Sequence, residues 1–374
     1  MPNRFSQLAP CLLLALTLLP PAFLPPGAAA QDKLGAAAQD ISVPAGYFAN
    51  PIAIGADPWV VKAPSGDGYL WCAATADNTA LTIYTSDELT SMGQPHVIWE
   101  APKSGPYSKE VWAPEFHHLD GRWYVYFAAS DGQNANHLTY VLQSRTDDPL
   151  GEYTLHGPLA TGEGKDGRSP NIWAIDVTVL EHANQRYAIW SGWDAPGTDR
   201  QFLYIAPMKN PLELGATRVR IASNDDFPWE ITEPGPKGRG LNEGPEVLKT
   251  DKRTFVIYSC GASWLPTYKL GMLELVGDDP LQPSSWKKHD KPAFESTEET
   301  YGVGHSTFVQ SSDKTQWWHV YHAKLSREPG WHRGIFLQSM RITDDGYPDF
   351  GKPLPAGKPL KKPSAELLEA VLQK

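Results

Sequence analysis

One plan recurs five times along this chain: a polar residue, a short apolar strand, a hydrophilic turn and a second, aromatic-rich strand. Successive copies start about sixty residues apart, at Asp57, Pro114, Asp176, Gly244 and His305. That spacing exceeds the ~40–50 residues of common propeller repeats and leaves room for four short strands and their loops. Radial repetition of small sheets leaves only short, protected edges. The recurrence therefore predicts an all-β, five-bladed β-propeller. A two-sheet sandwich is the alternative, but it would not explain the regular spacing.

The N-terminus has the pattern of a secretory signal peptide. Arg4 supplies positive charge, Leu12 to Leu19 form a short apolar run, and small residues at 28–30 suit cleavage. The run is too short and too proline-rich to span a membrane. We expect a signal peptide at 1–30, with cleavage possible as late as 38, and a secreted or periplasmic protein. The remaining divisions are an N-terminal segment (31–49), the propeller domain (50–355) and a C-terminal tail (356–374).

Net charge limits the classes of partner that the protein can bind, and the positions of the cysteines indicate whether they form a disulfide. The 33 Lys and Arg against 43 Asp and Glu give a net charge of −10. This balance argues against nucleic acid or anionic membranes as partners and favours a neutral ligand. Cys72 and Cys260 fall on the second strands of blades one and four, which are not neighbours in a ring of five. Because a disulfide needs Cα atoms within about 7 Å, we expect both thiols to be free and buried.

Polar residues open the five repeats. In a propeller the innermost strands all begin at one end of the central channel, so their first residues point toward the axis. These positions, or their immediate neighbours, hold Asp57, Glu115, Asp176, Glu243 and His305. Acidic residues are poor strand formers, and crowding them costs free energy through desolvation and repulsion. Several acidic residues at unfavourable strand positions around one end of the channel therefore predict a functional site there.

Each of these residues also has a structural interpretation. Asp57-Pro58 is a common turn dipeptide, and a carboxylate such as Asp176 inside an apolar strand needs a partner. For Glu115 we favour a structural role. Gly244-Pro245 is interpreted as a turn that holds Glu243 at the mouth of a short strand, with Glu246 facing the other way into solvent.

Five motifs together resemble glycoside hydrolase family 43: ADPWVV at 56–61, WAPE at 112–115, AIDVTV at 174–179, NEGPEV at 242–247 and GHSTFV at 304–309. The resemblance covers residues 50–355. It implies a five-bladed propeller that performs inverting glycoside hydrolysis. By position it implies Asp57 as general base, Glu243 as general acid, and Asp176 as the residue that raises the pKa of the acid and orients it. Such a reaction needs a protonated acid and an ionised base on opposite faces of the sugar.

The resemblance also implies a plant cell-wall polysaccharide or oligosaccharide as substrate. WAPEF and GWHRGIFLQ look closer to exo-acting α-L-arabinofuranosidases, which would release terminal α-L-arabinofuranose from arabinan or arabino-oligosaccharides. A β-D-xylosidase and an arabinoxylan-debranching enzyme are the alternatives. Candidate sugar contacts are Trp59, Trp112, Phe116, Trp173, Trp264, His305 and Arg333.

The sequence also bears on cofactors and on two alternative classes of function. No cofactor is required, and the resemblance implies a structural calcium or sodium ion beside His305, although the chain has no Asp-rich calcium loop. A non-catalytic carbohydrate-binding propeller would keep the aromatic residues but would not need three converging carboxylates. A metal-dependent hydrolase would have to use His117 with His118, or His319 with His322. Strand alternation places His117 and His118 on opposite faces, which disfavours joint ligation.

Overall fold

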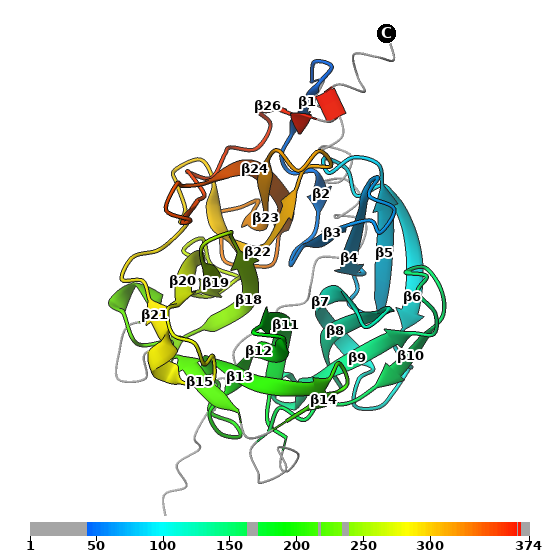
Figure 1. Ribbon diagram of the computed structural model, residues 1–374, viewed down its shortest axis with the longest axis vertical. Helices are drawn as coiled ribbons and strands as arrows, with labels where there is room; N and C mark the ends of the chain where they lie inside the picture. Colours follow the sequence, from blue (N-terminus) through cyan, green and yellow to red (C-terminus); the bar gives the residue numbers. More distant parts are fainter. Residues whose placement is uncertain (1–42, 163–170, 216–217, 234–238, 365, 368–374) are drawn as a thin grey trace, which may run out of the picture.

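Five β-sheets surround a central axis in the computed structural model, which describes residues 43–162, 171–215, 218–233, 239–364 and 366–367. Strands β3, β7, β11, β18 and β22 lie nearest the axis (Figure 1). This arrangement confirms the predicted five-bladed, all-β propeller rather than a sandwich. The predicted signal peptide lies outside the described residues.

Each blade is an antiparallel sheet, and in the first four blades the strands run in chain order outward from the axis, whereas the fifth blade ends on β2 from the N-terminal part of the chain. The innermost strands are β3 (Trp59–Lys62), β7 (Lys109–Leu119), β11 (Ala174–His182), β18 (Asn242–Lys249) and β22 (Tyr301–Gln310). The second strands are β4 (Tyr69–Ala74), β8 (Arg122–Ser130), β12 (Gln185–Trp193), β19 (Thr254–Cys260) and β23 (Trp317–Lys324). These ten strands form the five strand pairs that the repeats predict.

The outer strands are shorter and less regular. The third strands are β5 (Ala80–Ser86), β9 (Leu138–Ser144), β13 (Gln201–Asn210), β20 (Lys269–Leu275) and β24 (Arg333–Ile342). The outermost strands are β6 (Gln94–Glu100), β10 (Tyr153–His156), β14 (Glu213–Leu214) with β15 (Val219–Ala222), β21 (Trp286–Lys288) and β2 (Ala53–Ile54). The short elements outside this plan are β1 (Tyr47–Ala49), β16 (Ile231–Glu233), β17 (Arg239–Gly240), β25 (Pro348–Asp349), β26 (Pro359–Lys361) and the 3-10 turns η1 (Asn134–Asn136), η2 (Pro228–Glu230) and η3 (Pro283–Ser285).

Hydrophobic clusters lie between neighbouring blades and bury both faces of the sheets. In β8, Trp123 and Phe127 pack into the cluster shared with blade one, whereas Tyr124 and Tyr126 pack into the cluster shared with blade three. Successive side chains on a strand point to opposite faces, so a strand buried on both faces is apolar along its whole length. Much of the aromatic content therefore belongs to the core.

The ring closes through segments from both ends of the described chain. Strand β2 adds to β24 and completes the fifth blade. Next to it, Nδ2 of Asn50 donates to the Leu337 carbonyl at 2.9 Å, and the Leu337 N–H donates to Oδ1 of Asn50 at 3.0 Å. Strand β1 pairs with β26, so the predicted N-terminal segment and C-terminal tail each contribute a strand to one small sheet.

Both cysteines outside the predicted signal peptide are free and buried, which confirms the expectation for Cys72 in β4 and Cys260 in β19. Burial raises the pKa of each thiol, so both are unreactive. No helix in the described part of the chain is long and apolar enough to cross a membrane.

Candidate active site

A residue with a left-handed backbone stands at an equivalent place in every blade, inside the inner strand of the last four blades and just before β3 in the first. These residues are Asp57, Ala113, Asp176, Gly244 and His305, with φ between 42° and 56°. In the last four blades the strand register shifts across this residue, which marks a β-bulge. Bulges re-aim side chains, and strained backbone gathers at functional sites. The five bulged or strand-opening residues therefore define one end of the channel as the candidate active site.

This equivalence corrects the predicted register in blade two, where the residue equivalent to Asp57 is Ala113 and neither Pro114 nor Glu115. In blade four it is Gly244, where that repeat was predicted to start, with Glu243 one position earlier. Gly244-Pro245 is also not a turn before a short strand, because β18 runs unbroken from Asn242 to Lys249 with a bulge inside it. An extra bulge residue shifts the pairing by one, which alternation patterns alone do not reveal.

Asp57 is surrounded by positively charged and imidazole groups. Oδ1 accepts a hydrogen bond from Nη1 of Arg333 at 3.2 Å and lies 3.1 Å from Nδ1 of His322 and 3.3 Å from Nδ1 of His305. Burial by itself would raise the pKa of Asp57, but Arg333 and the two histidines outweigh it and hold the pKa below its ordinary value. Asp57 is therefore ionised at neutral pH.

The surroundings of Glu243 raise its pKa, whereas those of Asp57 lower the pKa of Asp57. Its side chain is buried, and burial is the main cause that raises its pKa to about 7, aided by the negative charge of Asp57. The Tyr268 hydroxyl, which donates to Oε1 at 2.9 Å, acts against this rise, as do Arg333 and the Ser263 hydroxyl. Near neutral pH a large fraction of Glu243 therefore carries a proton.

Asp176 connects the two other carboxyl groups. Its Oδ2 accepts the backbone N–H of Gly244 at 2.9 Å, directly beside Glu243. Burial raises the pKa of Asp176 well above its ordinary value, and the charges of Glu243 and Asp57 raise it further. Gly244 has little freedom here, because its φ is +51° and a Cβ would lie 2.9 Å from Nδ1 of His305. Asp176 thus holds the bulge that carries Glu243.

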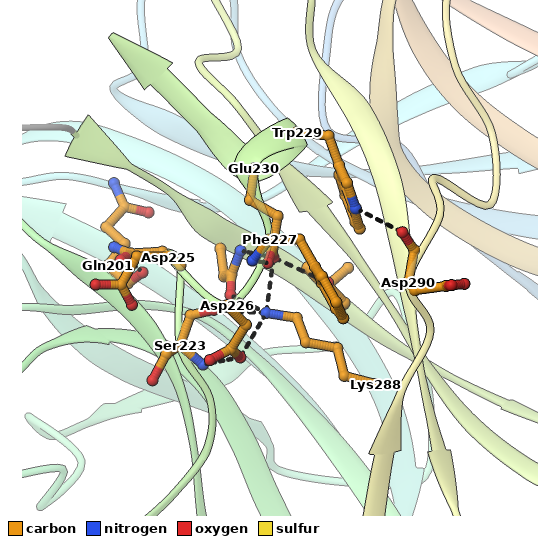
Figure 2. A network of polar contacts seen from close by, with 12 residues as sticks. Gln201, Ser223, Asp225, Asp226, Phe227, Trp229, Glu230, Lys288 and Asp290 are labelled. Atoms are coloured by element: carbon orange, nitrogen blue, oxygen red, sulfur yellow. Dashed lines mark hydrogen bonds and ion pairs between the residues drawn. The ribbon is translucent and has the colours of Figure 1, made fainter. Parts of the chain in front are cut away.

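A buried ion pair joins Lys288 to Glu230, and Figure 2 shows both side chains next to Asp226. Nζ of Lys288 in β21 is 2.7 Å from Oε1 of Glu230 in η2, and 3.0 Å from Oδ2 of Asp226. The same Oε1 accepts Nδ2 of Asn242 at 2.9 Å and the hydroxyl of Tyr258 at 3.0 Å. Since Asn242 precedes Glu243, this network ties the outer strand of blade four and η2 to the strand that carries the acid.

The five aromatic residues among the predicted sugar contacts fall into two groups, core residues and partly exposed ones. Trp59 and Phe116 belong to the core: the Trp59 indole N–H donates to the Phe116 carbonyl at 2.8 Å, and Phe116 is fully buried. Trp173 is buried in a stack against Trp193, with ring centroids 5.1 Å apart. Trp112 is half-buried.

Trp264 differs from these four because it is partly exposed and pairs with Trp331, with ring centroids 5.6 Å apart. Trp331, Tyr268 and His322 are residues near the site that the sequence-based list does not contain. Trp331 lies inside the GWHRGIFLQ segment, and His322 was considered only as a metal ligand; no local pattern distinguishes either from core residues. Tyr268 lies 25 residues after its partner Glu243, and only the fold brings them together.

Two further glutamates lie deeper in the channel, two positions beyond the bulge residues of their blades. Glu246 is buried, which corrects the expectation that it is solvated, and its Oε2 accepts the Thr178 hydroxyl at 3.3 Å. Glu115 is also buried and contacts Nε2 of His117 at 3.1 Å. Burial raises the pKa of both carboxyls well above the ordinary value. Past them, a pocket of about 390 Å³ opens among Trp59, Thr178, Glu246 and their neighbours.

His305 is the residue beside which the family resemblance implies a calcium or sodium ion. No group of three or more His, Cys, Asp or Glu side chains in the described ranges could hold a metal ion. Calcium takes six to eight oxygen ligands, whereas Nδ1 of His305 faces an Asp57 carboxylate already engaged by Arg333. This donor set does not fit calcium. His117 and His118 separate as expected, since Nε2 of His118 pairs with Asp147. His319 bonds the Ser306 hydroxyl, away from His322.

An ionised carboxylate and a buried one whose pKa is raised to about 7, at the same end of a propeller channel, can act as base and acid. That combination is the chemistry of glycoside hydrolases. The model of the family described as glycosyl hydrolases family 43 matches residues 48–348. The chain belongs to this family.

The chain is similar to several proteins that bear arabinofuranosidase names. The chain is similar to an extracellular exo-alpha-(1->5)-L-arabinofuranosidase of Streptomyces avermitilis, with 32% identity over 84% of this chain and 65% of the relative. It is similar to alpha-L-arabinofuranosidase 43 of Humicola insolens, with 32% identity over 81% of this chain and 62% of the relative. Among solved structures, the alpha-L-arabinofuranosidase from Lactobacillus brevis superposes with a TM-score of 0.74 and 30% identity, covering 83% of this chain and 98% of that one. The chain spans less than two thirds of the length of the Streptomyces and Humicola relatives.

Proposed function

We propose that this chain is an inverting, exo-acting α-L-arabinofuranosidase that releases terminal α-L-arabinofuranose from arabinan or arabino-oligosaccharides. The observation that carries the proposal is the opposite protonation of two carboxyl groups: the pKa of Asp57 is lowered, whereas that of Glu243 is raised to about 7. Relatives more than 30% identical bear arabinofuranosidase names, which favours an arabinofuranoside over the alternatives, a β-D-xyloside or the side chain of an arabinoxylan.

In this proposal Glu243 donates its proton to the glycosidic oxygen while Asp57 removes a proton from the attacking water. The three contacts of Asp57 fall on Oδ1, which leaves Oδ2 to hold that water. Inversion requires roughly 6.5–9.5 Å between the two carboxyls so that the water fits between base and sugar. Asp176 orients Glu243 through Gly244, and in its ionised form its charge favours the protonated acid.

Arg333 and His305 are proposed sugar contacts. Among the described residues, Nε of Arg333 is buried and has no hydrogen-bond partner. A buried donor without a partner costs about 1–3 kcal/mol, so a hydroxyl of the terminal sugar would satisfy it. The reaction proposed here uses no cofactor, and an ion beside His305 stays a hypothesis. Export is proposed from the leader pattern and from the extracellular name of the Streptomyces relative.

The test separates the acid from the base. Glu243→Ala should nearly abolish hydrolysis of an arabino-oligosaccharide, whose leaving alcohol is weakly acidic, yet keep much activity on an aryl arabinofuranoside with an acidic phenol. Asp57→Ala should lose both activities by about 10²–10⁴-fold, because every substrate needs the activated water. Glu246→Gln is the matched control in the same motif and should show no such dependence on the leaving group.

Two outcomes would contradict the proposal. If Glu246→Gln shows the leaving-group dependence and Glu243→Ala does not, the acid has been assigned to the wrong glutamate. If neither shows it, the acid–base mechanism fails. Substrate class is tested on wild-type protein with aryl α-L-arabinofuranoside, aryl β-D-xyloside, linear arabinan and arabinoxylan. Faster cleavage of the xyloside would overturn the arabinofuranosidase assignment.

A further inference from the structure

Trp331 is the most exposed large hydrophobic side chain in the part of the chain that the structure describes. It is 62% exposed, and the other members of that group are all aliphatic: Ile54, Val97, Leu150 and Val276. Leaving an indole in water forgoes the favourable free energy of burying its large apolar surface. Trp331 is also not isolated, because its ring lies 5.6 Å from the partly exposed ring of Trp264, at an interplanar angle of 55°.

The indole pair is continuous with the carboxylate site. Cζ of Arg333 lies 5.3 Å from the centroid of the Trp331 ring, and Nη1 of the same guanidinium bonds Asp57. The loops that carry the two indoles are joined, because the Gly330 N–H donates to the Trp264 carbonyl at 2.9 Å. The pair therefore forms an apolar shelf at the mouth of the site rather than a separate surface patch.

The position of Trp264 shows which side of the scissile bond the shelf borders. Trp264 follows Ser263, and the same loop leads to Tyr268; both of these hydroxyls hydrogen-bond Glu243. The acid must lie next to the glycosidic oxygen, which departs with the leaving group. A shelf built from the loop that holds the acid is thus on the side of the leaving group.

We propose that Trp264 and Trp331 form the subsite for the sugar on the leaving-group side, with Trp331 as the main stacking face. This inference rests on the proposed function and names its occupant: the penultimate arabinofuranose of the substrate chain, whose apolar C–H face would cover the indole. A protein partner fits less well, because a specific interface buries about 1,000 Å² or more, whereas two indoles match a single sugar ring.

The experiment compares two substrates whose leaving groups are both alkyl alcohols but differ in size. Methyl α-L-arabinofuranoside has no second sugar, and α-1,5-arabinotriose has one that reaches the shelf. Trp331→Ala should lower kcat/KM on arabinotriose by about tenfold, which corresponds to about 1.4 kcal/mol, and change it less than about twofold on the methyl glycoside, which does not reach the indole. Trp331→Phe should recover much of the loss on arabinotriose. Trp317→Ala, a half-buried tryptophan at the opposite end of the channel, should leave the ratio of the two substrates unchanged.

The outcomes separate three explanations. An equal loss on both substrates would mean that Trp331 only positions Arg333, and would overturn the subsite. No loss on either substrate would overturn it as well. If wild-type protein hydrolyses neither substrate, the proposed function itself fails, and the subsite fails with it.

Discussion

At the scale of single residues, Glu243 has neighbours that act on its pKa with opposite sign. The Tyr268 hydroxyl donates to Oε1 and lowers the pKa, because a hydrogen bond to the ionised carboxylate stabilises it. Negative charge has the reverse effect. The charge of Glu243 raises the pKa of Asp176, and since repulsion is mutual, an ionised Asp176 must favour the protonated form of Glu243.

Two nearly isosteric variants should therefore move the pH profile in opposite directions. Tyr268→Phe removes the hydrogen bond, raises the pKa of Glu243 and shifts the basic limb of kcat/KM to higher pH. One hydrogen bond of about 1 kcal/mol corresponds to roughly 0.7 pH unit. Asp176→Asn removes negative charge yet keeps an oxygen for the Gly244 N–H, so the basic limb should move to lower pH. The profiles are measured on an arabino-oligosaccharide; limbs that shift in the same direction would contradict this account.

At the scale of elements, a buried ion pair joins η2, β18 and β21. Glu230 is fully buried, and the side chain of Lys288 is 10% exposed. Such a pair contributes little net stability compared with apolar residues of similar volume, but losing one partner leaves a buried charge uncompensated. Its role here is to hold Asn242, and hence the start of the strand that carries Glu243.

Lys288→Met should lower the free energy of unfolding by about 3–5 kcal/mol, measured by urea denaturation. Lys209→Met is the control, because Lys209 pairs with Glu213 at an exposed position, and such pairs contribute about 1 kcal/mol or less. The double variant Lys288→Met with Glu230→Gln should recover part of the loss, since neither charge then remains. Equal effects of the two lysine variants would show that Glu230 does not depend on Lys288.

At the scale of the whole molecule, the propeller is closed by contacts between residues almost three hundred positions apart. Asn50 is fully buried, and its side chain forms two hydrogen bonds to Leu337 across a separation of 287 residues. The strand pairs β2–β24 and β1–β26 lie on either side of this contact in the chain. Closure therefore depends on a few specific polar contacts in addition to the hydrophobic clusters between blades.

Asn50→Ala should destabilise the fold by about 2–4 kcal/mol, because it leaves the N–H and the carbonyl of Leu337 without their partner in a buried place. Asn136→Ala is the matched control: its side chain is exposed and bonds Asp131 at the surface, so we expect a change within about 0.5 kcal/mol. Both are measured as shifts in the urea midpoint. An unchanged midpoint for Asn50→Ala would mean that closure rests on the strand pairs alone.

The recurrence of strand pairs determined the architecture, because alternation and turn chemistry are local and each blade repeats them. The same repeats predicted that Asp57, Asp176 and His305 open equivalent strands, and the backbone of all three is left-handed at that place. The place of the bulge at Ala113 in blade two, rather than at Pro114 or Glu115, was not predictable, since a bulge shifts register without leaving a periodic signal. Burial also reversed the expectation for Glu246.

What the sequence by itself determined is the five-bladed ring and the family to which its motifs belong, because both are encoded in local patterns repeated in order. Only the tertiary structure decided the electrostatics of the site. Arg333 meets Asp57 across 276 positions and Trp264 meets Trp331 across two blades. A pKa depends on burial and on charges a few ångströms away, and those distances exist only once the ring has closed.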